Sequence, residues 1–429
     1  MILRNLKTYN EPLISLFSRA VTIICIFLIT AITSRKLDDT DFAIWTLFIT
    51  IINLVPLLNF GLNIGLVNKL TYLNSKQSDK LKINNLVTSF LFFQILISTL
   101  LIIIFFTLNF SFEINQIKTL KSQIQSIELI IILIFISIPF QVYSSVLYSF
   151  KKINIANLST ALQNIILLLS VVVVSENFLE NFVFNYSISY LLIFLVFYAL
   201  SFIFLKLKVE FNKIRLYINE FKSILYKSLE FWVLSVISNI LNTGQLLIVG
   251  LFFGLSQIPA YFLIQKLFSL LNTFHLAFIS PYNVKFISNA ANDNWSDSKN
   301  IINTLLYKIS IPFFLISGIV ILFFHSELIM LWSSKEIINY YSCILFLISG
   351  LCLGISNIYS VFLNSLGLFK FQLKLAFLNF LIFLLVFIFS KNFLNEFSVI
   401  FATIPSLTVI IILYRIYFNK IINNKLINI

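Results

Sequence analysis

Long apolar stretches recur from one end of this 429-residue sequence to the other. A transmembrane helix needs about 20 mainly apolar residues to cross about 30 Å of hydrocarbon, and these stretches are long enough. Continuous apolar runs, such as those at 101–106 and 171–174, favour helices, because a strand of a membrane barrel alternates polar and apolar residues. With 59% hydrophobic and only 11% charged residues, the chain is expected to be an all-α integral membrane protein.

About twelve transmembrane helices are predicted. Their approximate ranges are 13–33, 42–67, 86–108, 129–150, 155–175, 182–205, 231–253, 259–282, 302–324, 340–366, 371–390 and 397–416. The three cysteines, Cys25, Cys343 and Cys352, lie in these segments with no spacing typical of a disulfide framework or a zinc site. We therefore expect the cysteines to be packing residues.

The basic residues are distributed unevenly between the two sides of the predicted helices. Most Lys and Arg residues lie at the termini and in the even-numbered loops. The odd-numbered loops contain only Arg35, Lys36, Lys118, Lys121, Lys335 and Lys391. By the positive-inside rule, both termini are expected in the cytoplasm. We attribute the net charge of +13 to this topology signal and to anionic membrane lipids, so no nucleic-acid partner is expected.

The sequence also indicates an internal duplication. Residues 143–169 align without a gap on 359–385, an offset of 216 residues. We therefore predict an N-terminal lobe at 1–205, a cytoplasmic linker at 206–230 and a C-terminal lobe at 231–429. Because each lobe contains an even number of helices, the lobes should be related by an axis along the membrane normal, as in transporters built from parallel repeats.

Three segments carry a resemblance to a known family: NFGLNIGLVNKL at 59–70, the segment 260–289 with its Pro281, and FLNSLGLFK at 362–370. With the length, the helix number and the duplication, the chain resembles the polysaccharide and O-antigen lipid flippases of the multidrug/oligosaccharidyl-lipid/polysaccharide (MOP) exporter superfamily. The resemblance implies two six-helix lobes around a central cavity and transport by alternating access. It also implies a lipid-linked oligosaccharide substrate, carried on undecaprenyl diphosphate.

Such a role implies a place in O-antigen, lipopolysaccharide or capsule polysaccharide biosynthesis in the bacterial cytoplasmic (inner) membrane. The partners it implies are the lipid-linked oligosaccharide, membrane lipids, a coupling ion (proton or sodium) and a glycan polymerase. No cofactor is expected.

Two basic residues lie well inside predicted helices, where a charged side chain needs a reason because it is costly in lipid. They are Arg19 in the first helix and Lys266 in the eighth. Lys266 shares a polar helix face with five other side chains, Gln265, Ser269, Asn272, Thr273 and Ser280, and further amides lie on the second and seventh helices. The predicted substrate-binding residues are Arg19, Lys266, Asn53, Asn239, Asn242, Gln265, Ser269 and Asn272. Cations and amides of this kind can bind a diphosphate and sugar hydroxyls.

Structural explanations stand beside this interpretation. Arg19 and Lys266 could extend to a nearby interface, and the Asn and Ser side chains could join helices by hydrogen bonds. Lys308 also falls within a predicted helix, close to one end. His275, at the edge of the polar face, is either a proton carrier or a packed histidine.

Two other function classes are alternatives to a flippase. An ion-coupled drug/cation antiporter of the same superfamily ranks second, since it should hold a carboxylate within the membrane and none is evident. A membrane glycan polymerase or ligase ranks third. The sequence contains no nucleotide-binding glycine loop, no metal-ligand cluster and no nucleophile constellation. The chain is therefore expected not to be an enzyme.

Overall fold

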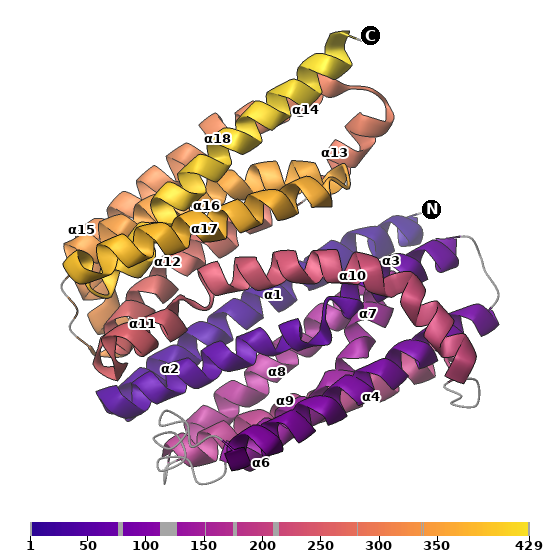
Figure 1. Cartoon of the computed structure of the whole chain (residues 1–429), viewed down its shortest axis with the longest axis horizontal. Coiled ribbons are helices and arrows are strands. Elements are labelled where there is room, and N and C mark those ends of the chain that lie inside the picture. Colours follow the sequence, from indigo (N-terminus) through magenta and orange to yellow (C-terminus); the bar gives the residue numbers. More distant parts are fainter. Residues whose placement is uncertain are drawn as a thin grey trace. The chain divides into compact units, whose positions relative to one another are not determined.

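The fold is entirely helical in the described part of the chain. The computed structural model describes residues 2–75, 80–111, 127–150, 152–174, 178–208, 214–280, 282–335, 337 and 339–427. Within these ranges eleven helices are long and apolar enough to cross a membrane, or up to twelve if one bent pair counts as a span. No strand occurs in these ranges. The predicted all-α membrane class is therefore confirmed (Figure 1).

The chain divides into two compact units, unit 1 (Met1–Trp232) and unit 2 (Val233–Ile429). The helices of unit 1 are α1 (Ile2–Lys36), α2 (Asp39–Leu54), η1 (Val55–Asn59), α3 (Leu62–Ser75), α4 (Lys80–Ser111), α6 (Ile127–Ser137), η2 (Ile138–Gln141), α7 (Val142–Ser149), α8 (Ile153–Val173) and α9 (Phe178–Leu205). Helix α10 (Ile214–Asn242) begins in unit 1 and ends in unit 2.

The helices of unit 2 that follow are α11 (Gln245–Phe253), η3 (Leu255–Gln257), α12 (Ile258–Ile279), α13 (Tyr282–Ala291), α14 (Trp295–Asn303), the π-helical segment η4 (Thr304–Ser310), α15 (Ile311–Ser333), α16 (Tyr340–Ser365), α17 (Phe369–Leu394) and α18 (Phe397–Ile427). Residues 214–230, which the sequence analysis placed in a cytoplasmic linker, are helical and continuous with the predicted seventh span.

The predicted second helix, 42–67, is interrupted, so the expectation of one unbroken helix there is wrong. Helix α2 gives way to η1, which contains Pro56, a residue that cannot donate a backbone hydrogen bond. Phe60 and Gly61 then adopt left-handed conformations with φ of 53° and 70°. The Gly61 N–H donates to Asn59 Oδ1 at 3.0 Å. The segment 59–70 therefore forms this break and most of α3.

The first part of α10 holds the break in place. The Trp232 indole N–H donates to the Leu57 carbonyl at 2.6 Å, and its ring lies 4.9 Å from that of Phe60. A Cβ atom at Gly61 would overlap the Ser228 carbonyl oxygen and lie 3.1 Å from Trp232 Cβ. Only glycine fits both the backbone angle and this close approach.

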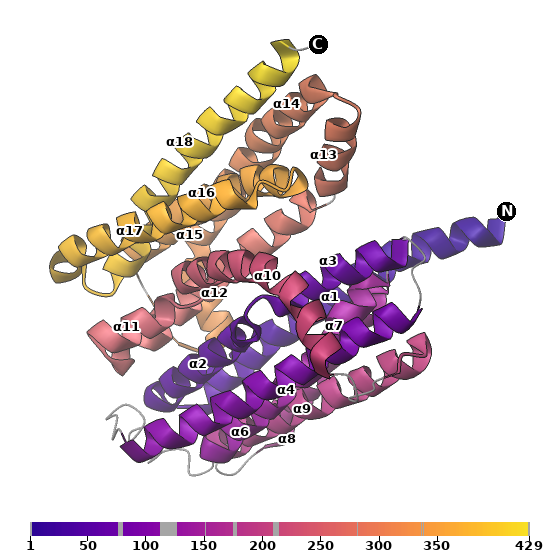
Figure 2. The same cartoon turned by 45° about the vertical axis from the view of Figure 1, so that its right-hand side comes forward.

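In unit 1, α1 packs along α8, and α6 packs against both α4 and α9 (Figure 2). The end of α8 is capped from α1: Lys36 Nζ donates to the carbonyls of Val171 at 3.0 Å, Val172 at 3.4 Å and Val174 at 2.9 Å. The last carbonyls of a helix have no partner within that helix, so a cation there is favourable. Lys36 thus has a structural role, although the sequence analysis counted it as a loop residue.

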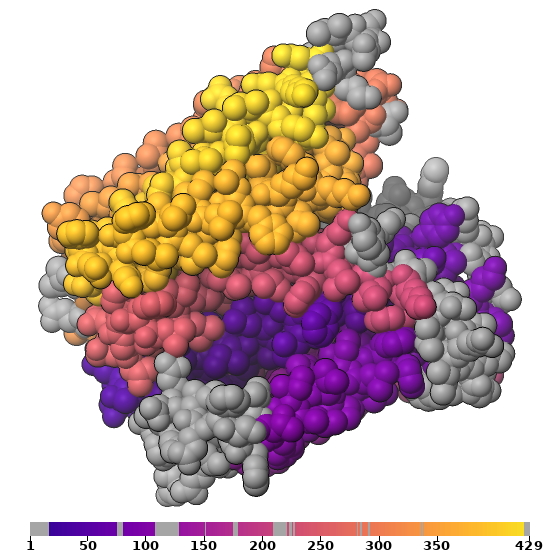
Figure 3. All heavy atoms as spheres, viewed as in Figure 1, coloured from indigo at the N-terminus to yellow at the C-terminus, as the bar shows by residue number. Residues whose placement is uncertain are grey.

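In unit 2, α18 packs against both α16 and α17. Aromatic rings fill the contact of α16 with α18: Phe362 meets Phe418 at 5.1 Å, and Tyr359 stacks on Tyr414 at 6.2 Å. Figure 3 shows the segment of α17 at the surface of unit 2, and several large apolar side chains of this helix are exposed. Its exposed side chains include Phe377, Leu381, Leu385, Ile388, Phe389 and Phe393. Such a surface fits contact with lipid.

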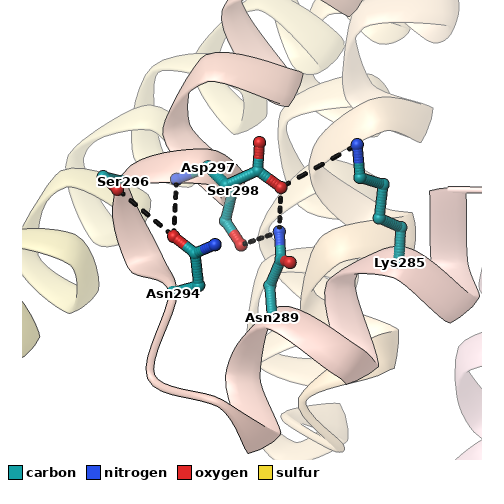
Figure 4. A network of polar contacts seen from close by, with 6 residues as sticks. All are labelled: Lys285, Asn289, Asn294, Ser296, Asp297 and Ser298. Atoms are coloured by element: carbon teal, nitrogen blue, oxygen red, sulfur yellow. Dashed lines mark hydrogen bonds and ion pairs between the residues drawn. The ribbon is translucent and has the colours of Figure 1, made fainter.

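A polar corner joins α13 to α14 (Figure 4). The Asn289 amide donates to Asp297 Oδ2 at 2.9 Å and to Ser298 Oγ at 3.2 Å, and Lys285 Nζ lies 3.8 Å from Asp297 Oδ2. Asn294 caps α14 by accepting from the Asp297 N–H at 3.4 Å. The corner therefore fixes the direction in which the chain enters the span formed by α14, η4 and α15.

The duplicated segments share a turn. Helices α7 and α16 end at Ser149 and Ser365, and α8 and α17 begin at Ile153 and Phe369, in each case 216 residues apart. The backbone bond from Lys152 N to Leu147 O, 2.8 Å, corresponds to that from Leu368 N to Leu363 O, 3.1 Å. This agreement supports the internal duplication inferred from the sequence.

Candidate functional site: the polar face of helix α12 and the bent helix before it

The predicted site residues are divided between the two units. Arg19 on α1 and Asn53 on α2 belong to unit 1, and both side chains are exposed. The remaining predicted residues, Asn239, Asn242, Gln265, Lys266, Ser269 and Asn272, belong to unit 2, on α10 and α12. Within the unit 2 group, the structure joins α10 to α12 through Asn242 and Gln265.

The helix before α12 is bent. Helices α10 and α11 meet at an angle of 53° around Thr243 and Gly244. The N–H groups of both residues converge on the Asn239 carbonyl, each at 2.8 Å. The side-chain amides of Asn239 and Asn242 donate to carbonyls of their own helix, Ser235 and Ser238, at 2.8 Å. These donors support the helix next to the bend, and the amide oxygens remain as acceptors.

A residue that the sequence analysis did not single out, Gln245, connects the bend to α12. Its Oε1 accepts from Tyr261 Oη at 2.9 Å and from Gln265 Nε2 at 3.1 Å. Gln265 Nε2 also donates to the Asn242 carbonyl at 3.2 Å, and Gln245 Nε2 donates to the Leu241 carbonyl at 2.7 Å. The available signal was a glutamine directly after a glycine inside an apolar stretch. This network places Asn242 and Gln265 side by side.

Lys266 is half-buried on the same face of α12. Its Nζ lies 5.7 Å from the centre of the Phe262 ring, one turn earlier on the same helix. Within the described ranges no carboxylate forms an ion pair with it. A cation over an aromatic face gains a modest attraction, so the charge is only partly compensated. The ammonium group therefore remains available to an anion.

Two further polar residues extend the face along α12. Ser269 Oγ donates to the Lys266 carbonyl at 2.8 Å, so it is bonded within its own helix. Asn272 is half-buried, and its Oδ1 is buried without a hydrogen-bond partner. Lys308, also considered from the sequence, is an exposed residue of η4. His275 is fully buried and bonds to Ser310 across helices.

The donor set of this face suits an oxygen-rich ligand. It offers one ammonium group and several amides and hydroxyls. Among the described residues no group of three or more His, Cys, Asp or Glu side chains could hold a metal ion. Chemically, the face can bind a phosphate through Lys266 and exchange hydrogen bonds with hydroxyl groups through its amides.

Known proteins resemble this chain in structure but not in sequence. No protein-family model and no curated protein sequence matches the chain. An inward-facing multidrug resistance MATE family transporter of the MOP superfamily matches with a TM-score of 0.73 and 13% identity, over 96% of this chain and 98% of that chain. The lipid II flippase MurJ, in an inward closed conformation, matches with a TM-score of 0.72 and 15% identity, over 98% and 91%.

A MOP superfamily transporter from Pyrococcus furiosus, described as having a binding pocket of reverse polarity, matches with a TM-score of 0.65 and 12% identity, over 96% of this chain and 94% of that chain. These likenesses extend over nearly the whole of each chain. The chain is therefore a multi-pass membrane protein with the fold of the MOP superfamily transporters.

Proposed function

We propose that this chain is a flippase that moves an undecaprenyl-diphosphate-linked oligosaccharide, the repeat unit of an O-antigen or capsule, from the cytoplasmic to the outer leaflet by alternating access. One observation carries the proposal: Lys266 lies half-buried on the polar face of α12, with an aromatic ring as neighbour and no acidic partner in the described chain. A cation kept in a membrane helix without a counter-charge is suited to an anionic substrate.

The neighbouring side chains fit the rest of such a substrate. The amides of Asn239, Asn242, Gln265 and Asn272 and the hydroxyl of Ser269 are suited to sugar hydroxyl groups. Arg19 and Asn53 of unit 1 are proposed as further binding residues, with the Arg19 guanidinium forming a bidentate pair with the diphosphate. The prenyl chain would stay in lipid, so only the head group would need polar contacts.

The proposal includes the setting of the protein. Both termini lie in the cytoplasm, the membrane is the bacterial inner membrane, and the product passes to a glycan polymerase. A proton or sodium gradient drives the cycle. The distribution of Lys and Arg between the loops supports this orientation.

The alternative is an ion-coupled drug/cation antiporter, because a MATE family transporter shares this fold as fully as the lipid flippase does. Binding a cation would be expected to need a carboxylate within a span. In α15, Glu327 is exposed and lies six residues before the end of the helix at Ser333. The deep polar face of α12 carries a positive charge, which favours an anion.

The test is a liposome assay with undecaprenyl-diphosphate oligosaccharide in both leaflets, followed by a membrane-impermeant oxidant that reports sugar exposure. The variant is Lys266→Gln, which keeps a polar side chain, one atom shorter, and removes its charge. The matched control is Lys391→Gln, because Lys391 also lies 5.7 Å from a phenylalanine ring, that of Phe252, but near the end of α17.

Wild type and Lys391→Gln should expose the sugar at equal rates. Lys266→Gln should be slower by about 10- to 100-fold, the effect of one charged hydrogen bond. Equal rates in all three proteins would remove Lys266 from the site. No sugar movement by wild type under either ion gradient, with drug cations transported instead, would establish the antiporter.

A further inference from the structure

A buried histidine in unit 2 has one nitrogen whose role the packing leaves open. His275 on α12 is fully buried. Its Nε2 lies 2.6 Å from Ser310 Oγ, at the end of the π-helical segment η4. Its other ring nitrogen, Nδ1, is buried without a hydrogen-bond partner. A buried nitrogen of this kind calls for an explanation, because an unmade hydrogen bond costs free energy.

The hydrogen bonds of Ser310 determine which ring nitrogen of His275 carries the hydrogen. Ser310 Oγ donates its single hydrogen to the Leu305 carbonyl at 2.7 Å, a contact that the π-helical turn makes available. The serine oxygen must therefore accept, so Nε2 of His275 carries the ring hydrogen. In the neutral ring Nδ1 then carries a lone pair that accepts no hydrogen bond. Insertions of this π-helical kind are frequent at functional sites.

A second unpartnered atom lies on the same side of the helix. Asn272 is three residues before His275, and residues at this spacing are neighbours on a helix surface. Its Oδ1 is buried and has no hydrogen-bond partner. The two open atoms are both acceptors, so they cannot bond to each other while the ring is neutral. A proton on Nδ1 would convert the ring into a donor toward this oxygen.

In the described part of the chain, the neighbours of the ring are aromatic and small residues. The ring contacts Phe313 at 6.1 Å and Phe314 at 5.0 Å between centroids, and a Cβ atom at Gly354 of α16 would lie 3.1 Å from its Cε1. None of the titratable side chains on the elements packed around α12 contacts the imidazole in the described structure. These are Tyr307 and Lys308 of η4, His325 and Glu327 of α15, and Tyr340, Tyr341, Cys343, Cys352 and Tyr359 of α16. On α12 itself, Tyr261 and Lys266 lie two or more turns earlier.

We propose that His275 Nδ1 and Asn272 Oδ1 form a buried proton-binding site in unit 2, and that the coupling ion of the proposed flippase is the proton. The coupling part rests on the proposed function. A lone imidazolium in an apolar core is costly, so the proton is held only while the Asn272 oxygen accepts from it. Asn272 also belongs to the proposed substrate face. A sugar hydroxyl that donates to this oxygen would therefore compete with the proton.

The chain offers an unusually clear experiment, because it contains only two histidines, His275 and His325. His325 is also fully buried, and its Nδ1 bonds within α15 to the Leu322 carbonyl at 2.9 Å. Its Nε2 also has no hydrogen-bond partner, but the residues one turn away on α15 are apolar, so no unpartnered acceptor corresponds to Asn272 there. In His325→Gln, all ¹⁵N-histidine signals arise from His275. This variant would be purified with ¹⁵N-labelled histidine in lipid nanodiscs without substrate, and the imidazole nitrogens followed from about pH 8 to about pH 4.

The expected result is reversible protonation at Nδ1, with Nε2 protonated throughout. Asn272→Leu, added to the same background, should lower the proton affinity by about tenfold, while Asn272→Asp should raise it, because a carboxylate pairs with the imidazolium. A ring that stays neutral over the whole range would overturn the site and leave a buried water as the occupant of the two acceptors. Protonation unaffected by either Asn272 change would overturn the pairing.

The transport assay separates this proposal from the proposed function. A proton gradient should accelerate sugar exposure by wild type and by His325→Gln, and this acceleration should vanish in His275→Gln. If the gradient accelerates all three equally, proton coupling through His275 is wrong although the flippase stands. If wild type moves no sugar but His275 titrates as expected, the flippase fails and the proton site stands.

Discussion

The two units share a turn but differ in their first helices. The α7–α8 turn of unit 1 and the α16–α17 turn of unit 2 begin and end at equivalent residues, with the same backbone hydrogen bonds. The first helix of unit 1, α1, runs unbroken from Ile2 to Lys36. Its counterpart in unit 2, α10 followed by α11, bends by 53°. The turn is therefore the same in both units, whereas the opening helix differs.

The two opening helices also differ in the hydrogen bonds of their polar side chains. In α1 the hydroxyls of Thr22, Thr30 and Thr33 bond to carbonyls of their own helix at 2.9 Å. At the bend of unit 2, Gln245 and Gln265 instead bond between elements. A straight helix can satisfy its side chains alone, whereas a bent one frees backbone groups that neighbours then bind. The bend and the polar face of α12 are thus joined by the hydrogen bonds of Gln265.

The largest expected effect compares two glycines, one in each unit, that share a φ of 70°. Gly61→Ala should destabilise the protein by about 3 kcal/mol or more, because strain adds to overlap with the Ser228 carbonyl. Gly367→Ala should cost only about 1 kcal/mol, since a Cβ atom there meets nothing within 4 Å. Thermal unfolding in detergent measures both. Equal losses would show that the packing of Ser228 and Trp232 against Gly61 is unimportant for stability.

An intermediate effect is expected at the end of α8. Lys36→Met keeps an unbranched side chain, one atom shorter, but leaves three carbonyls without their donor, so a loss of about 1–3 kcal/mol is expected. Lys391→Met, in the last turn of α17, is the control, because Lys391 contacts a ring. Hydrogen exchange should also increase at the end of α8 in the Lys36 variant only. Unchanged exchange there would contradict the capping role.

The smallest effect tests how far the matched turns agree in their side chains. Tyr143 and Tyr359 occupy equivalent positions, and both are buried. Tyr143 Oη bonds to Ser159 Oγ at 2.7 Å, whereas Tyr359 stacks on Tyr414. Tyr143→Phe should therefore cost about 1 kcal/mol and Tyr359→Phe less than that. Equal losses at the two positions, measured by the same unfolding experiment, would mean that the two turns are stabilised alike.

Sequence reasoning could predict the helical membrane fold because hydrophobic length alone determines which segments span a bilayer. It did not predict the break at Phe60 and Gly61, since one proline and one glycine leave the direction of the chain open until Trp232 and Ser228 pack against them. It also stopped short of the helix at 214–230, because a basic, polar stretch resembles a loop when its packing partner is unknown.

The candidate site was predictable only in part. The polar side of α12 follows from the spacing of Gln265, Lys266, Ser269 and Asn272, because helix geometry alone places them on one face. Gln245 was not predictable, since its importance comes from the bend that brings it to Tyr261 and Gln265. The assignment of the eight residues to substrate binding stays a prediction.

The contact of Lys36 with α8 has a consequence for how the protein is made. Its partners lie 135 to 138 residues further along the chain. At about 5–20 residues per second, the ribosome needs roughly 7–28 s to complete them after α1 has emerged. During that time α1 must reside in the membrane without its main packing partner, and its internally bonded threonines expose no unsatisfied hydroxyl hydrogens to lipid. Because α1 is synthesised before α8, its polar side chains need hydrogen-bond partners within α1 itself.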